Sequence, residues 1–192
     1  MEHVVGRRVI IVGSSGAGKS TLGEQLATRL GVPFIELDAL HWEPGWVEAE
    51  REVFRERVRQ ATEPDAWVMV GNYTRRQMDV SWPRADTVIW LDLPLPLILR
   101  RVSRRIWQRW RTQEDLWGTS NREAFREHLM FWNPDKSLIT YTITTHRRRQ
   151  RTFEAATTDP AYAHLRIIRL RSPNEVEHLL TNIGEYQLVQ TS

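Results

Sequence analysis

The glycine-rich loop near the start of the chain reads Gly13-Ser14-Ser15-Gly16-Ala17-Gly18-Lys19-Ser20-Thr21. It fits the pattern G-x-x-x-x-G-K-[S/T] in full, and it lies between an apolar run at 9–12 and a helix-forming run at 21–30. In this context a strand delivers the chain, the glycines allow a tight turn with inward N–H groups, and the following helix points its positive end at the same place. These nine residues, the phosphate loop, therefore predict a cradle for a polyphosphate.

Two side chains of the phosphate loop suit a triphosphate that carries a metal ion. Lys19 supplies a point charge for the β and γ phosphates, and the Ser20 hydroxyl is placed to hold a bridging magnesium ion. A chance match to the pattern is expected in about one chain in a hundred of this length. The flanking strand and helix therefore carry the prediction that the ligand is a polyphosphate with a magnesium ion.

The composition indicates one compact domain. A chain of 192 residues buries roughly 70% of the surface that its unfolded form exposes. It has no cysteine, which excludes disulfides and thiolate metal sites. No apolar run approaches the ~18 residues of a membrane span, and residues 1–8 lack the order of a secretion signal. We therefore expect a single cytoplasmic domain over residues 1–192 that makes no membrane contact and is a monomer or a homodimer.

Strands and helices alternate along the chain. Short apolar, β-branched runs are typical of buried parallel strands, and they occur at 8–12, 33–37, 66–70, 87–91 and 166–170. The segments between them have mostly helical spacing. This alternation predicts an α/β fold with a doubly wound parallel sheet of about five strands, with the site along the carboxyl edge of the sheet.

Helices are expected where apolar residues recur at helical spacing, at 21–30, 48–62, 95–110, 122–132 and 173–183. In the third of these, the predicted apolar stripe is Leu95, Leu99, Val102 and Ile106. Residues 111–121 are expected to form a mobile loop. Propensity leaves 138–145 undecided between strand and helix, and we favour a helix.

Polar residues follow the strands at the predicted edge. Asp38 ends the second strand, so its carboxylate faces the ligand crevice, unless it is only a turn residue or helix cap. The third strand is followed by a polar run that includes Asn72, Tyr73 and Arg75. Between these strands, Trp42 and Trp46 flank a Pro-Gly pair and either pack under a lid or stack on a ligand, and packing is favoured.

The basic residues are almost all arginine, since Lys19 and Lys136 are the sole lysines. Two clusters either bind nucleic acid, contact nucleotide phosphates, or form a solvated helix face. A solvated face is favoured for the second cluster and is given equal weight for the first. The clusters are Arg100, Arg101, Arg104, Arg105, Arg109 and Arg111, and Arg147 to Arg149 with Arg151.

Over residues 8–183 the chain resembles the nucleoside monophosphate and shikimate kinase class of P-loop proteins. The resemblance is carried by the phosphate loop, by Gly31 to Asp38, and by the Arg-rich segment after Leu91-Asp92-Leu93-Pro94. The segments His41 to Trp46 and Gly71 to Tyr73 more specifically resemble adenylate-kinase-like proteins labelled DNA topology modulation proteins.

This resemblance implies a three-layer P-loop fold with strand order 2-3-1-4-5, an acceptor-binding segment at about 39–65 and a lid at about 107–121. It implies that Gly13 to Thr21 hold the ATP phosphates and that Ser20 and Asp38 serve magnesium. The catalytic residues would be Lys19, Asp38, Arg100, Arg104 and Arg105, and the acceptor would meet Trp42, Asn72, Tyr73 and Arg75. One position departs from the pattern, because Val70 stands where related sequences usually have aspartate. In its place Asp38 or Asp92 would have to organise the metal.

The leading hypothesis is a kinase that transfers the γ-phosphoryl group of ATP to a small, nucleotide- or nucleoside-like acceptor. The alternative is a nucleotide-dependent regulator or DNA-associated ATPase, in which Trp107 and Trp110 stack on bases. Nucleic acid is not the favoured partner. A third hypothesis, motivated by Val70, is a nucleotide-binding scaffold without catalysis.

Overall fold

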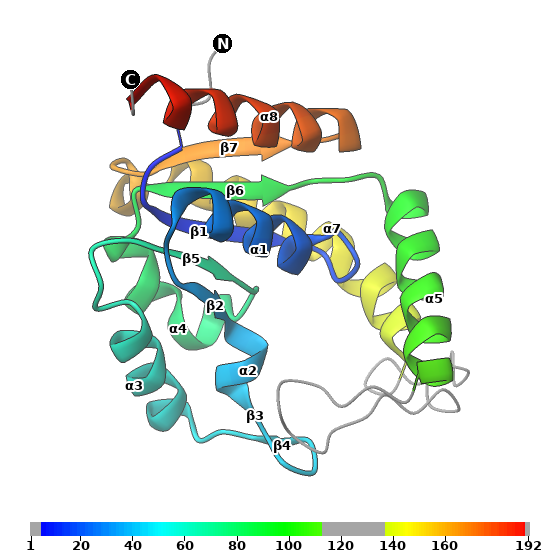
Figure 1. Ribbon diagram of the computed structural model, residues 1–192. Helices are drawn as coiled ribbons and strands as arrows, with labels where there is room; N and C mark the ends of the chain where they lie inside the picture. The colour runs from blue at the N-terminus through cyan, green and yellow to red at the C-terminus, as the bar shows by residue number, and fades with distance from the viewer. Residues whose placement is uncertain (1–4, 113–136, 191–192) are drawn as a thin grey trace.

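The computed structural model describes residues 5–112 and 137–190, drawn in colour in Figure 1. Five strands form one parallel sheet in the order β2-β5-β1-β6-β7. Counted along the chain this is the expected order 2-3-1-4-5, and the predicted α/β fold is confirmed. The strands are β1 (Arg8–Gly13), β2 (Phe34–Glu36), β5 (Trp67–Val70), β6 (Thr87–Leu91) and β7 (Arg166–Leu170).

Helices cover both faces of this sheet and thereby make three layers. Helices α1 (Lys19–Leu30) and α8 (Pro173–Gln190) lie on one face, with α1 in front of the strands in Figure 1. The other face packs against α3 (Arg51–Ala61), α4 (Thr74–Ser81) and α7 (Leu138–Thr158). Helix α5 (Leu95–Thr112) stands beyond the carboxyl ends of the strands (Figure 1). The expected helix at 122–132 lies outside the described residues, as does most of the expected lid.

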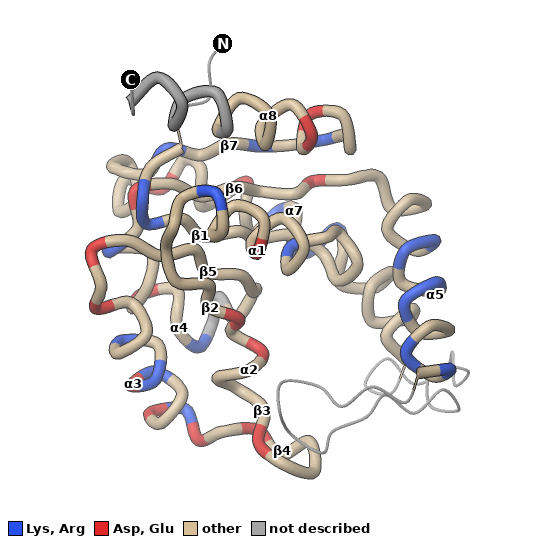
Figure 2. The backbone as a smooth tube through the Cα atoms, viewed as in Figure 1, with Lys and Arg blue, Asp and Glu red and all other residues tan. Residues whose placement is uncertain are grey.

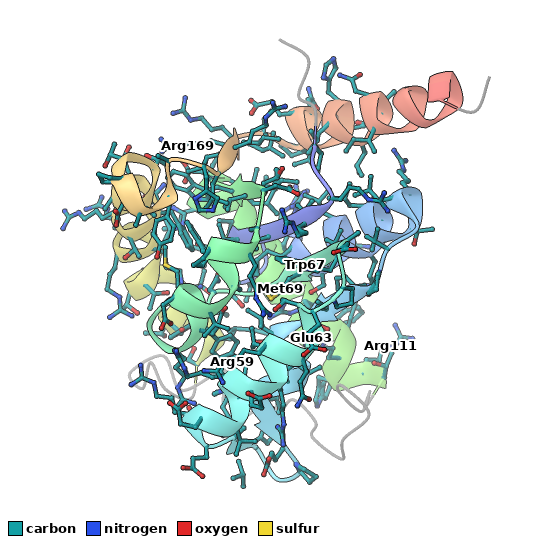
Figure 3. All side chains as sticks on the ribbon, turned by 90° about the vertical axis from the view of Figure 1, so that its left-hand side faces the viewer. Arg59, Glu63, Trp67, Met69, Arg111 and Arg169 are labelled. Atoms are coloured by element: carbon teal, nitrogen blue, oxygen red, sulfur yellow. The ribbon has the colours of Figure 1, made fainter. Side chains whose placement is uncertain are left out.

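The core is divided by the sheet, because successive side chains of a strand point to opposite faces. In β1, Val9 and Ile11 belong to the cluster under α1 and α8, while Ile10 and Val12 belong to the cluster under α3, α4 and α7. Trp67 and Met69 of β5 are fully buried in the second cluster, and Figure 3 shows them inside the molecule. The apolar runs of the sequence thus correspond to strands that are buried on both faces.

Short elements complete the chain. Helix α2 (Leu37–His41) leads into a small antiparallel pair, β3 (Trp42–Glu43) and β4 (Val47–Glu48). Two 3₁₀ turns, η1 (Trp82–Arg84) and η2 (Pro160–Tyr162), precede β6 and β7. Within the described ranges no helix is both long and apolar enough to cross a membrane.

Two element ends and one buried stripe differ from the expectation. Strand β2 ends at Glu36 rather than Leu37, because Leu37 turns into the core, where it packs against Gly71. A Cβ at Gly71 would meet the Leu37 Cβ at 2.7 Å, so glycine leaves the space that Leu37 fills. Helix α8 continues to Gln190, beyond its expected end near Ile183. The segment 138–145 is helical, as favoured, and begins α7 after an N-cap bond in which Ser137 accepts from the Thr140 amide.

The third difference concerns the buried stripe of α5, which is Ile98, Val102 and Ile106. Leu99, which the sequence placed on this stripe, is only half-buried. The segment begins with five consecutive residues that contain four apolar side chains and one proline, so periodicity alone cannot fix the stripe there. The predicted Val102 and Ile106 are confirmed, so the difference is confined to the start of the helix, where Ile98 is buried in place of Leu99.

Candidate functional site

The phosphate loop turns tightly between β1 and α1, at the carboxyl edge of the sheet. Gly16 and Gly18 have φ of +80° and +95°, a backbone conformation that favours glycine. A Cβ at Gly16 would lie 2.4 Å from Cγ2 of Val102, so the loop packs directly against α5. Helix α1 begins at Lys19, and its amino end faces the loop as the sequence pattern requires.

Asn72 holds the first residue of the phosphate loop. Its Oδ1 accepts a hydrogen bond from the Gly13 amide at 3.1 Å, and its Nδ2 donates to the Gly13 carbonyl at 2.6 Å. The side chain therefore satisfies both backbone groups at the end of β1. The acceptor contact that the resemblance implies for Asn72 stays a prediction, while the observed hydrogen bonds hold its amide against the phosphate loop.

Two carboxylates at the end of β2 face different partners. Ser20 donates a hydrogen bond from its hydroxyl to Oε1 of Glu36 at 2.7 Å. Asp38, in the first turn of α2, accepts a hydrogen bond from the Tyr73 hydroxyl at 2.7 Å. Sequence analysis missed Glu36. Its place as the last residue of β2, two positions before Asp38, was the available signal.

Glu36 lies next to Val70, the position at which related sequences usually have aspartate. Val70 is buried at the end of β5, and its register partner in the neighbouring strand is Glu36. The two positions lie side by side at the carboxyl edge of the sheet. A carboxylate close to the Ser20 hydroxyl is thus present although Val70 cannot supply it.

Lys19 is buried among charged groups of both signs. Its ammonium donates to the Ser14 carbonyl at 3.2 Å. Burial, together with the nearby Arg149 and Arg105, lowers the pKa of Lys19 from 10.5 to about 8, and Asp38 and Glu36 only partly offset this effect. Three cationic side chains from three different helices therefore converge on the phosphate loop.

The arginines of α5 divide into two groups. Arg101 donates to the Ala17 carbonyl at 3.1 Å, and Arg105 is close enough to Lys19 to lower its pKa. Arg105 is one of the three α5 arginines that are predicted to be catalytic. The other two, Arg100 and Arg104, are exposed. Figure 2 shows the basic residues along α5 and the acidic residues of the β2–α2 segment at separate places around the loop. The catalytic roles of these arginines stay predictions.

Arg149 of α7 was missed as a site residue, since the second arginine cluster was interpreted as solvated. Its Nη2 donates to the Tyr141 hydroxyl at 2.8 Å, while its Nη1 is buried and has no hydrogen-bond partner among the described residues. Buried donors are normally paired, so this guanidinium nitrogen near Lys19 is suited to donate to an anionic ligand. The signal in the sequence was helical spacing from the buried Phe153 through Arg149 to His146.

Trp42 and Tyr73 belong to an aromatic cluster around the buried His41. The ring centroids of His41 and Tyr73 are 4.4 Å apart, and those of His41 and Trp42 are 4.9 Å apart. Burial and the adjacent Asp38 raise the pKa of Tyr73 above its usual range, so the phenol stays protonated and donates to the carboxylate. The fourth predicted acceptor residue, Arg75, has a side chain outside the described part of the chain.

Asp92, the other carboxylate considered for a metal, accepts hydrogen bonds from side chains of β7 and α7. Its Oδ2 accepts two hydrogen bonds from Arg169, at 2.9 and 2.7 Å, and its Oδ1 accepts one from Gln150 at 2.7 Å. Arg169 also stacks over the Trp90 ring at 4.0 Å, at the β7 position labelled in Figure 3. Asp92 thus ties β6 to β7 and α7.

Comparison with known proteins agrees with this geometry. Residues 15–61 match the family model described as shikimate kinase. The shikimate kinase of Rhodopseudomonas palustris is 32% identical over 114 residues, which are 52% of this chain and 56% of that protein. The match therefore spans little more than half the length of that relative.

Solved structures extend the likeness to nearly the whole chain. Shikimate kinase from Aquifex aeolicus has a TM-score of 0.51 and 14% identity, covering 96% of this chain and 98% of that one. The chain has a shikimate-kinase-like fold. Shikimate kinase from Acinetobacter baumannii in complex with shikimate has a TM-score of 0.50 and 20% identity, covering 96% and 94%. In this shikimate-kinase-like fold, one edge of the sheet brings together the phosphate loop, Glu36, Asp38, Arg101, Arg105 and Arg149.

Proposed function

We propose that the protein is an ATP-dependent kinase that transfers the γ-phosphoryl group to a hydroxyl of a small molecule. The observation that carries this proposal is the convergence of Lys19, Arg105 and Arg149 on a complete phosphate loop. A buried ammonium whose protonation is further disfavoured by neighbouring guanidinium groups is costly to hold unless a dense anion binds beside it. A triphosphate is such an anion, and it is the ligand that the loop pattern predicts.

The residues around Ser20 fit magnesium. Mg²⁺ takes oxygen ligands, and at phosphoryl-transfer sites it is held by one or two protein groups together with the substrate phosphates. The Ser20 hydroxyl and the Glu36 carboxylate, 2.7 Å apart, offer this donor set. When bound, the ion would neutralise charge on the phosphates. We propose Ser20 and Glu36 as the residues that hold it, with Asp38 as a more distant contributor.

The side chains would act mainly through position and charge. Phosphoryl transfer requires an acceptor oxygen in line with the leaving group and cations beside the transferred group. Lys19 and Arg149 would contact the triphosphate from opposite elements. Asp38, which Tyr73 holds by a 2.7 Å hydrogen bond, would accept a hydrogen bond from the acceptor hydroxyl.

The acceptor would lie beside Asp38 and the cluster of His41, Trp42 and Tyr73. This position lies in the segment 39–65 for which the family resemblance implies acceptor binding. The names of the relatives make shikimate the first acceptor to test, followed by nucleosides and nucleoside monophosphates. The similarity of His41 to Trp46 and Gly71 to Tyr73 also leads us to propose the narrower group of DNA topology modulation proteins.

The test is an acceptor panel with the purified chain, ATP and Mg²⁺. We expect one acceptor to raise ADP formation at least about tenfold over the rate with water alone and to appear phosphorylated by mass spectrometry. Addition of EDTA should return the rate to background, and excess Mg²⁺ should restore it. ATP consumption that no acceptor stimulates would contradict the kinase proposal.

Nucleotide binding is expected to take up a proton at alkaline pH. Because the pKa of Lys19 is about 8 in the free protein, the ammonium is mostly deprotonated at pH 8.5, and a bound triphosphate raises this pKa again. We expect an uptake of about 0.7 proton at pH 8.5 and about 0.1 at pH 7. The affinity for ATP should therefore fall as the pH rises above about 8. Calorimetry in buffers of different ionisation enthalpy measures the uptake, and equal values at both pH values would contradict the expected shift.

A further inference from the structure

A buried histidine joins α7 to the phosphate loop. His146 Nδ1 lies 3.0 Å from the Ser14 hydroxyl, and the two residues are 132 positions apart in the sequence. Their exposed fractions are only 7% and 5%. Burial lowers the pKa of His146, and Arg149 and Arg147 act in the same direction against Asp92, so the ring is neutral at pH 7. Nothing proposed so far uses this side chain.

Ser14 connects His146 with Lys19. The Ser14 carbonyl accepts from the Lys19 ammonium at 3.2 Å and from the Ala17 amide at 3.0 Å, while its hydroxyl meets His146. One residue of the loop is thus held through its backbone by the loop and through its side chain by α7. A shift of α7 would be transmitted directly to the carbonyl that positions Lys19.

Arg149 lies between two attachments of α7. His146 is three positions before it and binds the loop, whereas Gln150 is the next residue and donates to Asp92 at 2.7 Å. Residues three and four apart on a helix share a face, so His146, Arg149 and Gln150 all point toward the sheet edge. These two hydrogen bonds fix where the turn that carries Arg149 lies along the helix axis and how it is rotated about that axis.

We propose that His146 is a positioning residue, which acts through Ser14 to keep Arg149 of α7 in register with Lys19 of the phosphate loop. The inference rests on the proposed kinase function, because it assigns both cations to one triphosphate. Transfer depends on such register, since a displacement of about 1 Å can lower a rate by about 10². The hydrogen bond supplies no group to the reaction and acts only on placement.

Steady-state kinetics of His146 variants test this role. We expect His146→Ala to lower kcat about 10- to 100-fold while KM for ATP changes by less than about threefold. His146→Asn should recover kcat to within about threefold of the original protein, because its amide can take the place of Nδ1 beside the hydroxyl. The exposed His164 offers a matched control, and His164→Ala should leave kcat unchanged.

A double-mutant cycle identifies the path. Ser14→Ala should reproduce the loss of His146→Ala, and combining the two should add less than about twofold. Multiplicative losses, an Asn variant as slow as the Ala variant, or a kcat of His146→Ala within twofold of the original would each overturn the inference. If His146→Ala does not fold, Ser14→Ala and His146→Asn still decide it. An original protein without transfer would overturn the proposed function, whereas an active protein with unaltered variants overturns only the role of His146.

Discussion

Replacing Lys19 with alanine is expected to lower kcat by at least about 10³ and to leave the fold intact. A charge aimed at the transferred group stabilises the transition state, and a factor of 10³ corresponds to about 4 kcal/mol. The folded protein gains little from Lys19, since its surroundings lower the pKa of the ammonium to about 8. The substitution removes this unfavourable burial and one hydrogen bond to the Ser14 carbonyl. We therefore expect an unchanged or slightly higher Tm.

Two measurements separate catalysis from folding in this variant. Circular dichroism and thermal unfolding report the fold, and acceptor-stimulated ADP formation reports transfer. Lys19→Arg keeps the positive charge but replaces the compact ammonium with a larger, planar guanidinium group. It should therefore recover little of the rate. A Lys19→Ala protein with a kcat within tenfold of the original would remove the phosphate loop from the mechanism.

The order of the sheet and the place of the phosphate loop follow from local patterns. Each strand is a short apolar run that ends in polar residues, and the loop needs its glycines at fixed positions whatever lies around them. The parallel order then follows from alternation with helices and from the resemblance to P-loop kinases. The strands and the loop can thus be recognised from local sequence and the strand order from the resemblance, and the structure agrees with both.

The side chains that complete the site depend on contacts between distant elements. Helix α5 shows this most clearly, because its contact with Gly16 through Val102 places Arg101 at the loop and leaves Arg100 exposed. The sequence likewise does not identify Arg149 as a site residue. Its role depends on which face of α7 meets the sheet, and a run of arginines does not contain that information.

Arg149→Ala is expected to lower kcat by about 10³ or more, the second large effect at this site. An arginine beside the transferred phosphoryl group can contribute 10³ to 10⁵ in rate, or about 4 to 7 kcal/mol. Arg149 is placed for this role because its buried Nη1 has no partner among the described residues and its charge acts on Lys19. Steady-state rates with the stimulating acceptor measure the loss.

Arg148 provides the matched control, since it is the preceding residue of α7 and is exposed. Arg148→Ala removes the same charge from the same helix, so any general electrostatic effect should be equal in the two variants, whereas only Arg149→Ala should lower kcat strongly.

Loss of Arg149 should also raise the pKa of Lys19, because the second-largest influence that depresses this pKa is gone. The proton uptake on ATP binding at pH 8.5 should then decrease in Arg149→Ala and stay unchanged in Arg148→Ala. Equal rates and equal proton uptake in the two variants would place Arg149 outside the triphosphate site.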